Sequence, residues 1–137
     1  MKFNRARFCR EILGNFHFLS AEFKLRRTSR VLTYEFVDRY TDDDVVISIF
    51  VAHPELPHIS LAVATAPSDD YHYSFVGARP GAKLKRLYDR ELERHPGDYE
   101  AVSEAYRNVA KQQARSVRSA LSAIRRKRRP GPDWKGK

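Results

Sequence analysis

The segment Val45-Val46-Ile47-Ser48-Ile49-Phe50-Val51 decides the fold, because it places an aliphatic side chain at every second position. A period of two is typical of a strand with one buried face. The same alternation recurs in three further segments: Phe23 with Leu25, Leu32 with Tyr34 and Phe36, and Ile59 with Leu61 and Val63. The sequence therefore predicts four strands.

The connections between these segments predict an antiparallel sheet. We expect loops at residues 27–30, 41–44 and 53–57, each too short for a helical crossover. Neighbouring strands should then pair as hairpins in a meander, with one face left for a helix to cover. A further alternation of Tyr71, Tyr73 and Phe75 leaves open a fifth strand over residues 71–76.

Three segments predict helices. Residues 4–22 carry an apolar face with helical spacing, formed by Phe8, Ile12, Phe16, Leu19 and Phe23. Gly14 and Asn15 favour a bend or fraying within that helix. Two more helices are expected over residues 82–94 and 99–127, with Asp98 capping the last helix and Glu100 in its first turn.

These elements predict an α+β fold in one domain over residues 1–127. The helix and the sheet fall in residues 1–80, and the helical part falls in residues 81–127. The segment 77–81, which contains glycine and proline, separates the two. Residues 128–137 lack periodicity, and we expect a mobile basic tail there.

The net charge of +9 arises entirely in the second part of the chain. Lys and Arg balance Asp and Glu at 10 against 10 up to Pro80, but outnumber them 16 to 7 from Gly81 onward. The last helix concentrates this excess in a ridge beside its apolar stripe, followed by a run of cations at 125–129. A positive potential of this kind attracts acidic proteins or phosphates. The predicted partner-binding residues are Arg107, Lys111, Arg115, Arg118 and Arg125.

The sequence carries no familiar catalytic or nucleotide-binding motif, so we expect neither an enzyme nor a cofactor. No glycine-rich phosphate loop and no GxSxG motif can be written. Cys9 lies on the first predicted helix, where a buried structural residue is the commoner interpretation. His53, His58 and His72 leave open a metal site or an unfamiliar enzyme, but their generic spacing favours surface histidines.

The acidic run Asp42-Asp43-Asp44 has a similar pair of interpretations, as a cation site or as a solvated turn. It lacks the spaced oxygen ligands of a calcium loop. We therefore expect a turn between two strands and no bound metal ion.

Three segments together resemble small bacterial immunity proteins, which neutralise polymorphic or contact-dependent toxins. They are FLSAEFKL at 18–25, LTYE at 32–35 and the strand at 45–51, within a match over roughly residues 8–65. In the family pattern a helix ends in Phe-Leu, a Phe-Gly-Phe-like segment leads into the first strand, and a tyrosine-bearing hairpin strand follows. This chain has Lys24 where the pattern has glycine. The resemblance implies a cognate toxin as partner, and the basic ridge then suits a toxin with an acidic face.

A nucleic-acid-associated protein is the alternative function, with phosphates bound by the basic helix and tail. No membrane association is expected, because His53, Pro54, Glu55, Pro57 and His58 interrupt the most apolar region, residues 45–66. The chain shows no signal-peptide pattern at its start. With a single cysteine, these features favour the cytoplasm.

Overall fold

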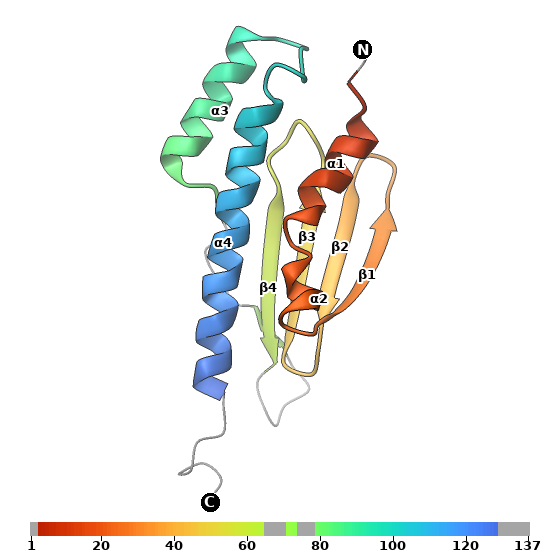
Figure 1. Cartoon of the computed structure of the whole chain (residues 1–137), viewed down its shortest axis with the longest axis vertical. Helices are drawn as coiled ribbons and strands as arrows, with labels where there is room; N and C mark the ends of the chain where they lie inside the picture. Colours follow the sequence, from red (N-terminus) through yellow and green to blue (C-terminus); the bar gives the residue numbers. More distant parts are fainter. Residues whose placement is uncertain (1–2, 65–70, 74–78, 129–137) are drawn as a thin grey trace, which may run out of the picture.

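The computed structural model describes residues 3–64, 71–73 and 79–128 and shows an α+β fold (Figure 1). Two short helices open the chain, a five-stranded antiparallel sheet follows, and two more helices complete the fold. The expected mobile tail falls outside the described residues from residue 129 onward. Arg128 is the last residue of the final helix.

The N-terminal helical region divides into α1 (Arg5–Gly14) and α2 (Phe18–Ala21). The Asn4 side chain caps α1 by accepting a hydrogen bond from the Arg7 backbone N–H at 3.0 Å. The break falls directly after Gly14, at the bend expected from the sequence. Both helices still bury one apolar face, formed by Phe8, Ile12, Phe16 and Leu19.

The sheet is a meander in the order β1 (Arg26–Val31), β2 (Phe36–Thr41), β3 (Val45–Val51), β4 (His58–Ala64) and β5 (Tyr71–Tyr73). Every neighbouring pair is antiparallel, as the short connections predict. The fifth strand exists over residues 71–73, while the remainder of its expected range lies outside the described residues.

The expected position of the first hairpin is wrong. Residues 27–30, expected as a loop, form most of β1, and the turn lies instead at Leu32 to Glu35. Backbone hydrogen bonds in both directions close that turn, from Leu32 N to Glu35 O at 2.7 Å and from Glu35 N to Leu32 O at 3.4 Å. Leu32 and Tyr34, which were expected in a strand core, are therefore exposed. The prediction failed because every residue of β1 is exposed, so no alternating burial marks this strand.

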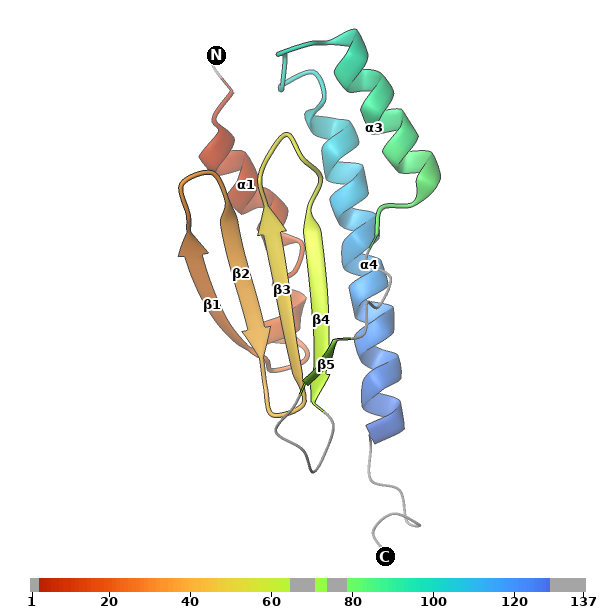
Figure 2. The same cartoon turned by 180° about the vertical axis from the view of Figure 1, so that it is seen from behind.

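One face of the sheet carries the core. Tyr40, Ile47, Ile49 and Leu61 lie on this face and are fully or almost fully buried. The helices α1 and α2 lie over it, and the last helix runs beside β4 (Figure 1). Viewed from behind, the opposite face of β1 to β4 has no helix in front of it (Figure 2).

The helical part consists of α3 (Ala82–Arg94) and α4 (Ser103–Arg128). The bounds of α3 are those predicted, but α4 begins four residues later than expected, at Ser103 instead of Tyr99. Asp98 caps a separate turn before α4, since its carboxylate accepts a hydrogen bond from the Ala101 N–H at 3.2 Å. No helix within the described ranges is both long and apolar enough to cross a membrane.

Long-range hydrogen bonds connect α3 and α4 to the loop between β3 and β4. The hydroxyl of Tyr88 donates to the Pro54 carbonyl, and that of Tyr106 donates to Glu55 at 2.7 Å. Gln113, the polar break in the apolar stripe, is fully buried, and its side-chain amide donates to the Pro57 carbonyl at 2.9 Å. Side chains from α1, the sheet, α3 and α4 thus enclose one core.

Candidate partner-binding surfaces

Three of the five predicted partner-binding residues bind other parts of the same chain. Arg107 forms hydrogen bonds through two guanidinium nitrogens to the carboxylate of Glu11 on α1. Arg118 pairs in the same way with Glu22, at 2.9 and 2.6 Å. Arg125 uses one nitrogen for both the Asp42 carboxylate and the Phe23 carbonyl, each at 2.9 Å.

Each of these arginines also lies over an aromatic ring of the N-terminal region. The guanidinium carbons are 5.2 Å from the Phe8 ring centre for Arg107, 4.3 Å from Phe18 for Arg118, and 5.6 Å from Phe23 for Arg125. Charge and ring stacking therefore act together at each position. The hydrogen bond with Arg118 lowers the pKa of Glu22 and raises that of the arginine.

The other two predicted residues, Lys111 and Arg115, face outward on α4. Both side chains are exposed, and neither has an ion pair within the described part of the chain. Arg126 shares this exposure further along the helix. At 100° per residue, these three positions fall on one side of α4, pointing away from the buried stripe. Their role in partner binding stays a prediction.

A second group of cations lies on the uncovered face of the sheet. The register places Arg26, Arg30 and Arg39 on the same side of β1 and β2, opposite to the core. All three are exposed. The sequence argument missed this group because the first 80 residues balance their charges. Several of those acids form ion pairs elsewhere, including Asp38 with Arg27 at 3.0 Å and Glu11 with Arg107. A neutral total therefore does not mean that the sheet face is neutral.

Apolar side chains gather at the exposed tip of the first hairpin. Val31 is 67% exposed, Leu32 43% and Tyr34 77%, values far above those of the core. Tyrosine is enriched among the residues that carry most of the binding energy in protein interfaces. The tip therefore offers a contact surface that the expected strand positions had hidden.

His53 and His58 lie in different surroundings. The expectation of a surface histidine is wrong for His53, which is 3% exposed and packs among aromatic rings, whereas His58 lies on the exposed side of β4. The side chain of His72 lies outside the described side chains. No cluster of three potential metal ligands occurs in the ranges that the structure describes.

Cys9 and Asp42 both have structural surroundings. Cys9 is fully buried in α1, and burial raises the pKa of its thiol. One oxygen of Asp42 accepts the backbone N–H groups of Asp44 and Val45, at 2.7 and 2.9 Å, which shapes the turn between β2 and β3. Its other oxygen binds Arg125. Asp42 is thus a turn former, as the solvated-turn interpretation predicts.

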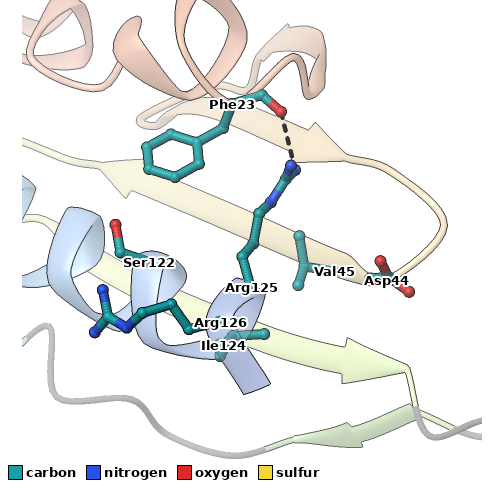
Figure 3. A pocket seen from close by; sticks show the side chains of 7 residues that line it. All are labelled: Phe23, Asp44, Val45, Ser122, Ile124, Arg125 and Arg126. Atoms are coloured by element: carbon teal, nitrogen blue, oxygen red, sulfur yellow. Dashed lines mark hydrogen bonds between the residues drawn. The ribbon is translucent and has the colours of Figure 1, made fainter. Parts of the chain in front are cut away.

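A pocket of about 450 Å³ lies where the C-terminal end of α4 meets the segment before β1 and the start of β3 (Figure 3). Phe23, Val45 and Ile124 supply apolar lining. Ser122 and Arg126 add a hydroxyl and a cation, while Arg125 reaches across to the Phe23 carbonyl. Asp44 adds a carboxylate, so the lining carries both signs of charge beside its apolar part.

Comparison with known proteins identifies no relative. No protein-family model, curated protein or solved structure matches the chain. The resemblance to immunity proteins consequently rests on the residues quoted above and stays a prediction.

Proposed function

We propose that this protein binds an acidic surface of a protein partner, a bacterial toxin, and neutralises it by covering that surface. The observation that carries the proposal is an outward row of three cations on α4 that have no ion pair among the described residues, namely Lys111, Arg115 and Arg126. Such a row attracts a negatively charged partner and orients it during encounter.

The anchoring of α4 supports this role. Arg107, Arg118 and Arg125 attach the helix to the N-terminal region along much of its length. A surface held rigid before binding loses less conformational entropy when the partner arrives. By fixing the position of α4, the arginines that bind internally also fix the positions of the neighbouring cations before a partner binds.

The conformation of Lys24 supports the resemblance to immunity proteins. The family pattern has glycine at this position, and Lys24 adopts φ 63°, in the left-handed region where glycine is favoured. The lysine is held there by a hydrogen bond from its amine to the Ala21 carbonyl at 3.1 Å. Lys24 thus has a backbone conformation that favours glycine, the residue found at this position in the family pattern.

Co-expression with the product of the neighbouring reading frame tests the proposal. An immunity gene lies directly beside its toxin gene, so the C-terminal region of that neighbour should arrest growth and this protein should restore it. The double variant Lys111→Glu/Arg115→Glu should lose most of the protection. The matched control Lys83→Glu/Arg86→Glu makes the same charge change at exposed positions of α3 and should protect normally.

A harmless neighbouring product, or full protection by Lys111→Glu/Arg115→Glu, would contradict the proposal. Equal loss in both double variants would show that total charge matters and that the α4 row has no special role. Purified protein and toxin should form a complex whose affinity follows the same order among the variants.

Nucleic-acid binding is a second candidate, favoured by the uncovered sheet face. Arg26, Arg30 and Arg39 lie there, and the register places no carboxylate on that face of β1 to β4 within the paired residues. Fluorescence anisotropy with labelled duplex and single strands tests it. Binding should be strong at about 50 mM salt and fall steeply by about 200 mM. No binding at the lower salt concentration would exclude this candidate.

A further inference from the structure

β1 forms one edge of the sheet and leaves part of its backbone unpaired. Among the strands that the structure describes it pairs only with β2, and all six of its residues are exposed. The turn pairs Leu32 with Glu35 through two backbone hydrogen bonds. Antiparallel ladders alternate, so Arg30 and Thr28 also bond to β2, whereas Arg27, Ser29 and Val31 direct their N–H and C=O groups outward. These groups can accept an additional strand.

A groove runs beside this edge, between α1 and β1. Its volume is about 210 Å³, and Leu13, Val31 and Phe36 give it an apolar lining. It exists because α1 packs over β2 and β3 and does not cover β1. An added strand would place alternate side chains in this groove.

The charge around the edge is positive. Arg26 and Arg30 lie on the outer face of β1, and Arg10 lines the groove. Asp38, the one acid among the described residues that line the groove, already binds Arg27 and the Ser29 hydroxyl, at 3.0 and 2.6 Å. An incoming chain would therefore meet arginines, and it would meet no free carboxylate among the described residues that line the groove.

We propose that the free edge of β1 binds an extended acidic segment of the partner as an added strand. The segment alternates, with apolar side chains in the groove and carboxylates facing Arg26 and Arg30. This inference rests on the proposed function for the identity of the partner, and it assigns a second contact surface distinct from the α4 row. Strand addition of this kind takes affinity from the main chain and specificity from alternate side chains.

A second copy of this chain fits the edge poorly. Antiparallel pairing of two β1 strands centred on Ser29 sets Arg30 opposite Thr28 of the other copy and diagonal to its Arg26 and Arg30, within reach of a long side chain. Like charges on paired strands are unfavourable, and charged edge strands resist self-association. The charge therefore favours an acidic partner strand.

A defined peptide probe tests the edge without the toxin. The probe is a capped peptide of about eight residues that alternates glutamate with valine or threonine. Binding is followed by NMR titration and amide hydrogen exchange on the full chain. We expect the amides of Arg27, Ser29 and Val31 to exchange rapidly in the free protein and to become protected on binding. A peptide N-methylated at alternate residues should not bind, because it lacks the donors of one edge.

Two variants of β1 separate backbone pairing from charge. Val31→Pro removes an outward N–H without breaking the ladder to β2, and it should weaken peptide binding about tenfold. Val31→Ala is its control, since it keeps the N–H and loses only side-chain contact. Arg26→Glu/Arg30→Glu should abolish binding of the acidic peptide, whereas Lys111→Glu/Arg115→Glu, with the same change in charge, should leave it unchanged.

The outcomes distinguish this inference from the proposed function. Unchanged exchange at the three amides, or equal binding of the N-methylated peptide, would overturn strand addition even if toxin neutralisation through α4 is intact. Protection of the same amides by an oligonucleotide, or by dimerisation at high protein concentration, would also overturn the assignment to an acidic protein segment. Peptide binding together with failure of neutralisation would leave the edge site standing and remove the toxin as its partner.

Discussion

His53 is a buried titratable residue in the middle of an aromatic cluster. Four aromatic rings surround its imidazole, with their centres 5.0–5.1 Å from the imidazole centre: those of Phe3, Phe8, Tyr99 and Tyr106. Neither ring nitrogen has a hydrogen-bond partner among the described residues. Burial, with a smaller contribution from the Arg5 charge, lowers the pKa of His53 to about 4.

The depressed pKa of His53 predicts loss of stability in mild acid. Between its unfolded pKa of 6.5 and its folded pKa of about 4, the unfolded chain binds the proton more readily. Stability should therefore be fully retained above about pH 6.5 and fall by roughly 3 kcal/mol as the pH approaches 4. Urea unfolding of the wild type and of His53→Phe across this range isolates the effect. Parallel curves for the two proteins would show that His53 titrates normally.

Lys24 is a second residue whose backbone sets a measurable expectation. Its left-handed φ of 63° is unfavourable for a residue with a Cβ atom. We expect Lys24→Gly to raise the free energy of unfolding by about 0.5–1 kcal/mol. Lys24→Ala is the control, because it removes the amine and keeps the strain. Chemical denaturation measures both, and a loss of stability in the glycine variant would contradict the expectation.

Among the elements, the helices and central strands follow local patterns and β1 does not. The bounds of β3 match its alternating segment, and those of α3 match its apolar side. β1 has no buried side, since it lies at the edge beyond the cover of α1. The position of an edge strand depends on which backbone groups its neighbouring strand leaves unpaired, and the periodicity of the sequence does not carry this information.

The hydrogen-bond pattern of β1 predicts opposite effects of proline at two of its positions. The N–H of Thr28 bonds to β2 in the derived ladder, so Thr28→Pro should cost about 1–3 kcal/mol. The N–H of Val31 points outward, and Val31→Pro should be much milder. Urea denaturation ranks the two variants. A greater loss in Val31→Pro would reverse the assigned register of hydrogen bonds.

At the scale of the whole molecule, three arginines hold α4, the last helix, to the N-terminal region. Arg107 contacts Glu11 and Arg118 contacts Glu22, each across 96 residues of sequence. Arg125 reaches Phe23 across 102 residues. These contacts join the two parts that a charge count along the chain separates as neutral and basic.

Removing two of these contacts should destabilise the fold. The double variant Arg107→Gln/Arg125→Gln loses two ion pairs and two ring contacts, worth about 1–3 kcal/mol together. Lys111→Gln/Arg115→Gln removes the same charge from positions with no ion pair in the described part of the chain, and it should change stability by no more than about 0.5 kcal/mol. Urea denaturation compares them, and the difference should shrink in about 1 M salt because ions screen exposed pairs. Equal stability of the two variants would exclude a structural role for the internal pairs.

The sequence by itself determined the α+β class, the meander and the placement of β3, β4 and α3, because these depend on local periodicity and short connections. It also located the arginines of α4 on one side of the helix. Only the tertiary structure decided that Arg107, Arg118 and Arg125 bind within the chain while Lys111 and Arg115 have no ion pair among the described residues. Their acidic partners lie some 80 to 100 residues away in sequence, on α1, after α2 and in the turn between β2 and β3. Only the packing of α4 against these segments brings them within reach.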